Sequence, residues 1–434
     1  MKARVRRGAS AFALTALVVT SCTSGDPSDA VGDTADTSNA VVGDPVVDRE
    51  AEVTPTTTPD PSPTRETEPS TDATPPPVAT ARPVSDTAVT DTATTGTATG
   101  TATTGTGTTD AGSPAGDPVC SAQTDLLPEN DEPVRVILDT DFAPDVDDAG
   151  ALGVLHALAD AGEVEILAVM VSDGGDARSD RAIDAINTFY GRPDIPIGVV
   201  AGAAPAGASV YVDELAAGFP NDVQETSSAT DLYRRILSGQ PDASVTILSI
   251  GYLTNLEALL SSSPDAASAS PGDRLVEQKV VRWVAMGGTY PDSIAHPLGA
   301  EFNFERDVTA AINSVADWPT PAVFAGWELG DVVLTGAVLQ TDTPPENPVR
   351  EAYRLFNGGQ AHRSWDLIAT LAAVRGTAGL FDVCTGRNVI GRGGSNRWEN
   401  DGENRHGYLR LTVPAADVAA VLDGLLVEPP GASP

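Results

Sequence analysis

The fold is decided by residues 134–149, VRVILDTDFAPDVDDA. An apolar run typical of a strand buried on both faces ends in five aspartates within ten residues, and an Ala/Leu-rich helical pattern follows at once. Carboxylates packed this densely repel one another, and a divalent cation with oxygen ligands is the usual way to hold them together. The segment therefore predicts a Ca²⁺- or Mg²⁺-type site. The alternative is an acidic loop in which Asp147 or Asp148 caps the next helix, although a cap needs a single aspartate.

Strand-like and helix-like segments alternate along the following 300 or so residues, which favours a doubly wound, mostly parallel α/β sheet with helices on both faces, an open Rossmann-like arrangement. The predicted strands are 134–138, 164–171, 197–200, 245–250, 280–286, 322–324 and 409–413. The predicted helices are 147–161, 178–190, 253–260, 349–356, 365–375 and 415–425. Parallel strands bring their carboxyl ends to one rim, so the polar segments that follow four of them can share one site. These segments are 139–148, 172–176, 250–255 and 286–289.

The first quarter of the chain has the pattern of an export signal followed by a tether. A basic start and a short apolar segment, 11–19, end in Val19-Thr20-Ser21-Cys22, which resembles a bacterial lipobox. That resemblance implies a signal peptide at 1–21, lipidation of Cys22 and anchoring to the outer face of a membrane; an ordinary cleaved signal with an incidental cysteine is the alternative. Residues 22–118, rich in Thr, Pro, Ala and Asp, predict a disordered tether because they cannot bury enough apolar surface to fold. The folded domain is then 119–434.

The net charge and the cysteines bear on which partners the protein binds and on whether it contains a disulfide. The formal net charge is -35 and no basic stripe is present, so nucleic-acid binding is not expected. Cys120 and Cys384 are the only cysteines besides Cys22. Outside the cytoplasm they could form a disulfide, and the sequence leaves that question open.

Four motifs, taken in order, resemble those of the inosine-uridine-preferring nucleoside hydrolases over roughly 134–375. They are Asp139-Thr140-Asp141 with Asp147-Asp148-Ala149, then 250–256 (IGYLTNL), then Met286-Gly287-Gly288 with 300–303 (AEFN), and finally Ser364-Trp365-Asp366-Leu367. The resemblance implies hydrolysis of the N-glycosidic bond of a ribonucleoside or similar N-riboside, with a Ca²⁺ at the floor of the pocket. It also implies a small-molecule nucleoside partner and, because the family often forms dimers or tetramers, leaves the oligomeric state open.

Carried over position by position, the resemblance assigns roles to seven residues. The implied Ca²⁺ ligands are Asp141, Asp148, Asp366 and the backbone carbonyl of Ile250. Asp141 is also the implied general base that takes a proton from the attacking water. The implied ribose contacts are Asp147, Glu301 and Asn303. For Glu301 and Asn303 the alternative is that they only cap a helix near 303–307.

The chain departs from the family pattern at three places. The histidine that precedes the family's late aspartate is replaced by Trp365, which can stack on a base or simply be buried; His362, three residues earlier, is the substitute acid if its loop turns inward. Asp176 follows Gly174-Gly175 and is either a sugar contact or a turn residue. His296 adjoins the position of an expected Asn and is a candidate acid or sugar contact. Whether Asp145 touches the metal stays open.

Three other functions compete with hydrolysis. An anchored protein that binds a nucleoside or ribose without turnover is the first, since family residues are missing from the upper pocket. A metal-dependent phosphatase of the haloacid dehalogenase type is the second, but the chain has only Lys2 and Lys279 and lacks the downstream lysine such enzymes need. A surface adhesin in which the domain is a spacer is the third, and four ordered pocket motifs argue against it.

Overall fold

The computed structural model describes residues 118–122, 124–128, 130, 132–175, 178–223, 226–292, 296–400 and 405–431. All of them belong to one compact unit, Thr104–Pro434. The predicted signal peptide, Cys22 and Asp176 lie outside the described residues, as does the tether apart from its last residue. No helix among the described residues has the length and apolarity that a membrane span requires.

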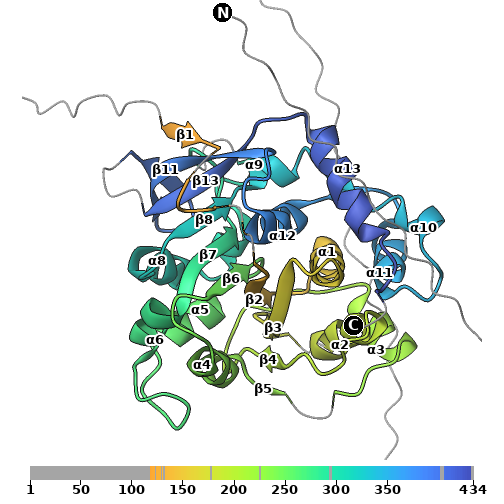
Figure 1. Cartoon of the computed structure of the whole chain (residues 1–434), viewed down its shortest axis with the longest axis horizontal. Helices are drawn as coiled ribbons and strands as arrows, with labels where there is room; N and C mark the ends of the chain where they lie inside the picture. The colour runs from red at the N-terminus through yellow and green to blue at the C-terminus, as the bar shows by residue number, and fades with distance from the viewer. Residues whose placement is uncertain are drawn as a thin grey trace, which may run out of the picture. The chain divides into compact units, whose positions relative to one another are not determined.

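A large, mostly parallel sheet forms the centre of the unit (Figure 1). Every neighbouring pair from β13 to β5 is parallel, whereas β11 is antiparallel to β1, β13 and the short β12 (Asn396–Glu399). A separate two-stranded sheet pairs β9 (Leu334–Thr335) with β10 (His362–Arg363). In spatial order the main strands are β1 (Val119–Ser121), β11 (Phe381–Ile390), β13 (His406–Leu411), β8 (Ala322–Ala325), β7 (Val280–Met286), β6 (Val245–Ser249), β2 (Val134–Thr140), β3 (Val164–Val171), β4 (Ile197–Val199) and β5 (Ser227–Ser228).

Helices cover both faces of this sheet (Figure 1). One face carries α1 (Asp147–Asp160), α2 (Ser179–Phe189), α3 (Val212–Gly218), α11 (Pro348–Asn357), α12 (Trp365–Arg375) and α13 (Ala415–Leu426). The other carries α4 (Ala229–Gly239), α5 (Thr254–Leu260), α6 (Gly272–Lys279) and α8 (Val308–Asp317). The short helices are α7 (Phe302–Arg306), α9 (Trp327–Gly330) and α10 (Leu339–Asp342).

The hydrophobic core has two layers because strand side chains alternate between the faces. Val136 and Leu138 of β2 pack in the cluster that contains Leu152 of α1, whereas Ile137 packs in the cluster that contains Leu256 of α5. All five are fully buried. The apolar runs of the sequence therefore form strands that are covered on both sides, and the predicted doubly wound α/β fold is confirmed.

The domain begins with a strand that is fastened to its C-terminal part. Cys120 of β1 forms a disulfide with Cys384 of β11, which answers the question that the sequence left open. β1 is antiparallel to β11, and β11 is antiparallel to β13, so β1 and β13 run in the same direction. Because β13 is parallel to β8, β1 runs in the direction of the parallel strands. Val119 is therefore at the end of β1 that faces the amino ends of those strands, although by register it lies level with Val323 of β8.

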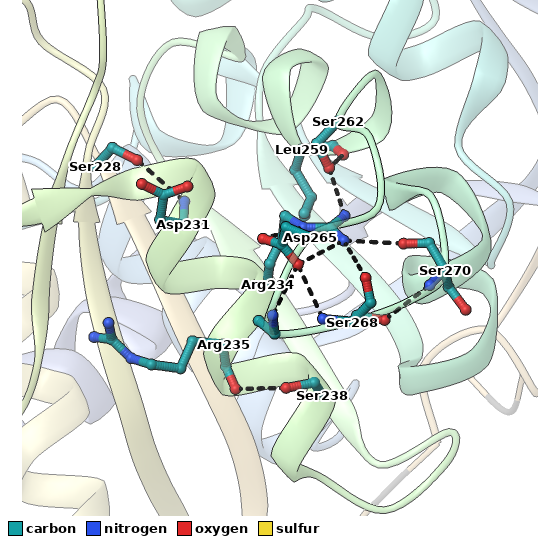
Figure 2. A network of polar contacts seen from close by, with 11 residues as sticks. Ser228, Asp231, Arg234, Arg235, Ser238, Leu259, Ser262, Asp265, Ser268 and Ser270 are labelled. Carbon is teal, nitrogen blue, oxygen red and sulfur yellow. Dashed lines mark hydrogen bonds and ion pairs between the residues drawn. The ribbon is translucent and has the colours of Figure 1, made fainter.

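A buried arginine holds the loop between α5 and α6. Arg234 of α4 is 1% exposed, and its guanidinium donates to Ser262 Oγ at 2.8 Å and to Asp265 Oδ1 at 3.0 Å (Figure 2). It also donates to the carbonyls of Ser268 and Ser270, each at 3.0 Å. The planar guanidinium has several N–H donors, so one arginine can hydrogen-bond to several acceptors of the loop at once. These bonds fix the loop against α4.

Candidate functional site

The aspartates that end β2 divide into a structural residue and a pocket residue. Asp139 is fully buried and accepts hydrogen bonds from the Tyr233 hydroxyl at 2.8 Å and the Asn255 amide at 3.2 Å, which joins β2 to α4 and α5. Burial raises the pKa of Asp139 to about 7. Two residues on, Asp141 is 4% exposed and lines a pocket.

Asp141 belongs to a cluster of four buried carboxyl groups contributed by the end of β2 and the first turns of α1 and α12. The others are Asp147, Asp148 and Asp366. The Asp366 backbone N–H donates to Asp147 Oδ2 at 3.1 Å, and this bond links the two helix starts. The residue before α1 is Val146, and neither Asp147 nor Asp148 provides a side-chain cap, so the capping alternative for this acidic segment is wrong.

Two oxygen atoms of this cluster are buried without a hydrogen-bond partner. Asp148 Oδ1 accepts from the Thr140 hydroxyl and from the Phe142 N–H at 3.2 Å, but Asp148 Oδ2 and Asp147 Oδ1 are buried without a hydrogen-bond partner. Burial, and after it the neighbouring carboxylates, raises the pKa of Asp141, Asp147 and Asp366 well above the usual range and that of Asp148 to about 7. Unpaired buried carboxylate oxygens are the donor set that a hard cation satisfies.

Glu301 and Asn303 follow β7 and tie the neighbouring strand ends together. Glu301 caps α7 by accepting from the N–H groups of Asn303 at 2.8 Å and Phe304 at 3.2 Å, and it accepts from the Gly288 N–H at 3.0 Å. The Asn303 amide donates to the Ile250 carbonyl at 3.1 Å and to the Met286 carbonyl at 3.3 Å. Glu301 therefore does act as a cap, and both residues also line the pocket.

The pocket has a volume of about 310 Å³ and is lined by residues of two kinds. The first kind, called here the acidic end, comprises the carboxylates and their neighbours Asp141, Asp145, Asp147, Ile250, Met286, Glu301, Asn303 and Asp366. The second kind, called the aromatic end, comprises Pro144, His296, Pro297, Leu298, Phe302, Trp327 and Trp365. Eight residues predicted for the site are thus brought together around one cavity. Asp148 lies among its neighbours in the carboxyl cluster but does not line the cavity, and Asp176 lies outside the described residues.

His362 also does not line the pocket. Its Nε2 lies 3.6 Å from Asp145 Oδ2, and its ring packs edge-on against Trp365 and Phe356. His362, Asp145 and Asp147 form a group whose ligand atoms all lie within 4.8 Å of one another and could hold a metal ion. Among the described residues the predicted ligands Asp141, Asp148 and Asp366 do not form a second group this tight, since Asp148 turns one oxygen toward Thr140 and Phe142.

Aromatic side chains build the other end of the cavity. The Trp365 indole N–H donates to the Trp327 carbonyl at 2.8 Å, and the His296 ring lies edge-on to Trp327 with the centroids 4.8 Å apart. Trp327 was missed from the sequence. The available signal was its position just after the apolar run of β8, where the other strands of the sheet also place pocket residues.

Comparison with known proteins agrees with this geometry. The family described as inosine-uridine preferring nucleoside hydrolase matches residues 136–409. Similar solved structures include a plant nucleoside hydrolase (22% identity, TM-score 0.51, covering 68% of this chain and 100% of that one) and an inosine-guanosine nucleoside hydrolase (18%, 0.54, 68% and 98%). A purine-preferring ribonucleoside hydrolase from Gardnerella vaginalis is a third (16%, 0.50, 68% and 99%). At these identities the structures show a shared fold. No curated protein matches the chain.

Proposed function

Because the chain belongs to the inosine-uridine preferring nucleoside hydrolase family, whose enzymes cleave N-glycosidic bonds, we propose that it hydrolyses a ribonucleoside or similar N-riboside to free base and ribose in a Ca²⁺-dependent reaction. One observation carries the proposal: buried carboxylates and aromatic rings line the same cavity. The carboxylates suit the hydroxyl groups of a sugar, and the aromatic rings suit a planar base.

The proposed cation site has oxygen donors only, although Asp141, Asp148 and Asp366 do not approach one another as closely as the Asp145, Asp147 and His362 group does. Asp141, Asp148, Asp366 and the Ile250 carbonyl would hold the cation; that carbonyl accepts one bond from Asn303 and keeps a second lone pair. Oxygen-only ligands in an irregular arrangement suit Ca²⁺. The Asp145, Asp147 and His362 group includes an imidazole nitrogen, which suits transition metals better. A bound cation would supply positive charge that makes a nearby water easier to deprotonate.

The remaining chemistry belongs to the side chains. Asp141 takes the proton from the water that attacks the anomeric carbon. Asp147, Glu301 and Asn303 exchange hydrogen bonds with the ribose hydroxyls and orient the sugar. The ribose passes through an oxocarbenium-like state, and the buried carboxylates stabilise its positive charge. Trp365, with Trp327 beside it, offers a stacking surface for the base.

The test is a panel of purine and pyrimidine ribonucleosides assayed for released reducing sugar, with and without a chelator. We expect turnover of at least one nucleoside, loss of turnover on chelation, and a fall in kcat of about 100-fold or more in Asp141→Asn. Asp213→Asn, whose side chain is 79% exposed on α3, is the matched control and should keep full activity. Turnover unaffected by both chelation and Asp141→Asn would refute the mechanism, whereas tight nucleoside binding without sugar release would favour the binding protein.

The location and assembly of the protein are part of the proposal. The lipobox-like segment ending at Cys22 supports export and a lipid anchor on the outer face of a membrane. The partner at the pocket is a small nucleoside or N-riboside. The family's habit of assembly supports a homodimer or homotetramer.

A further inference from the structure

We propose that His296 is the leaving-group donor of this site, acting as a neutral imidazole whose Nε2–H hydrogen-bonds to the base as it departs. This inference rests on the proposed function and names the residue that completes it. His296 lies between β7 and α7, where the chain passes over the aromatic end of the cavity.

The hydrogen bonding of the loop fixes the tautomer. His296 Nδ1 lies 3.2 Å from the Leu298 backbone nitrogen, whose N–H donates to it. A ring nitrogen that accepts a hydrogen bond carries no proton, so the proton of the neutral imidazole is on Nε2. Protonating Nδ1 as well would place two N–H groups against each other. Burial also lowers the pKa of His296, which acts in the same direction.

The ring is held in place by packing, and no residue that the structure describes bonds to its Nε2. His296 is 8% exposed and packs edge-on against Trp327, with the centroids 4.8 Å apart. Among residues 118–292 and 296–431, as far as the structure describes them, Nε2 has no hydrogen-bond partner. Because Nδ1 faces the backbone of its own loop, the edge with Nε2 is the one left for a ligand in the cavity that His296 lines.

The other polar groups near this end are less suited to donate. The Trp365 indole N–H is already bonded to the Trp327 carbonyl. Asp145, when ionised, can only accept. His362, the substitute acid expected from the sequence, stands outside the cavity wall with its Nε2 3.6 Å from Asp145 Oδ2.

The donated hydrogen bond acts on charge that develops during bond breaking. As the bond between the anomeric carbon and the base nitrogen breaks, its electron pair stays with the base, while the water oxygen bonds to carbon and its proton passes to Asp141. The Nε2–H bond stabilises the negative base but the proton remains on His296, because a neutral imidazole is a very weak acid. Solvent protonates the base after release.

Two variants separate the donor from the fold of the loop. His296→Asn can still accept from the Leu298 N–H but has no group at the position of Nε2, whereas the longer amide of His296→Gln can place an N–H there. Each is assayed with inosine and with 4-nitrophenyl β-D-ribofuranoside, whose leaving group is stable as an anion and needs no donor. His362→Gln is the matched variant at the competing histidine.

We expect His296→Asn to lower kcat with inosine about 100-fold, the usual cost of removing one donor from a developing anion, and to change kcat with the nitrophenyl riboside less than about 3-fold. His296→Gln should recover part of the loss with inosine. Activity toward the nitrophenyl riboside also shows that each variant is folded. An equal fall on both substrates in both variants, or a selective loss with inosine in His362→Gln instead, would overturn the inference. A wild-type protein that cleaves neither substrate and no other nucleoside of the panel would refute the proposed function itself.

Discussion

At the scale of single residues, the two unpaired buried oxygens, Asp147 Oδ1 and Asp148 Oδ2, set the electrostatics of the site. Neutral side chains of the same shape at these two positions would remove the repulsion between neighbouring carboxylates. They would also remove the negative charge that attracts a cation. Charged residues in a binding site commonly lower the free energy of unfolding of the ligand-free protein while they strengthen ligand binding, and both effects can be measured.

We predict that Asp148→Asn abolishes stabilisation by Ca²⁺. Asn keeps an oxygen for Thr140 and Phe142 but loses the charge. Saturating Ca²⁺, at about 100 times its dissociation constant, should stabilise the wild type by about 2.7 kcal/mol and leave the variant unchanged. Without added metal the variant should melt at the same temperature as the wild type or higher. Differential scanning calorimetry in Ca²⁺ and in chelator measures both effects, and an equal response of the two proteins to Ca²⁺ would contradict the assignment.

A second residue makes folding depend on pH. His156 is fully buried against Tyr190 and bonds to Asn187 Oδ1 at 2.9 Å. Burial lowers the pKa of His156 to about 4, below its unfolded value of about 6.5. Between these values the unfolded chain binds a proton that the folded chain does not, so this residue's contribution to stability is complete above about pH 6.5 and is lost as the pH falls toward 4.

We predict that His156→Gln removes this dependence. The buried aspartates with raised pKa make the protein less stable as the pH rises, which is opposite to the effect of His156. The quantity to compare is therefore the difference in unfolding free energy between wild type and variant at each pH. That difference in unfolding free energy should shrink by about 2 kcal/mol between pH 7 and pH 5 in urea titrations. A difference that stays constant with pH would show that His156 is not held neutral.

The motifs located the acidic end of the site more fully than the aromatic end. Asp141, Asp147 and Asp366 come directly at a strand end or a helix start, where backbone geometry alone directs them to the rim. His362 begins the two-residue strand β10 and Trp327 begins the short helix α9, and the direction of such short elements depends on packing between distant segments. Sequence spacing carries no information on that packing, which is why His362 was expected at the pocket only if its loop turned inward and Trp327 was not named.

At the scale of elements, strands buried on both faces were predictable and mixed segments were not. β3 and β7 match their predicted bounds, because continuous apolar runs have few other uses. β11, FDVCTGRNVI, was missed because polar residues interrupt its apolar ones and because its partners β1, β12 and β13 include segments far away along the chain. α4 was not predicted, although Leu232, Tyr233 and Leu237 have helical spacing.

The first element supplies a prediction of its own. The bond between Cys120 and Cys384 closes a loop with a sequence separation of 264 residues and holds the three-residue strand β1. We predict that Cys120→Ser lowers the unfolding free energy by about 2–4 kcal/mol while kcat changes little, because Cys120 lies in an edge strand far from the pocket residues. Guanidinium titrations with and without a reductant measure it. The reductant should weaken the wild type and leave the variant unchanged.

At the scale of the whole molecule, the chain combines an enzyme domain with a long polar extension of about a hundred residues. We predict that Cys22→Ser moves the protein from the membrane fraction of its bacterial host to the soluble fraction, with unchanged kcat toward nucleosides. A protein starting at Pro118 should keep both the fold and the activity. Fractionation followed by the nucleoside assay tests these outcomes, and a Cys22→Ser protein that stays with the membrane would rule out the lipid anchor.

The direction of β1 matters for anyone who wants to handle this protein. Because β1 runs with the parallel strands, its amino end points away from the carboxyl ends that surround the cavity, and β1 lies at an edge of the sheet four strands away from β7. Dyes, beads or electrode surfaces coupled ahead of Val119 should therefore leave the mouth of the cavity open to diffusing nucleosides. The same attachment through residues near Leu298, 80% exposed at the rim, would obstruct it.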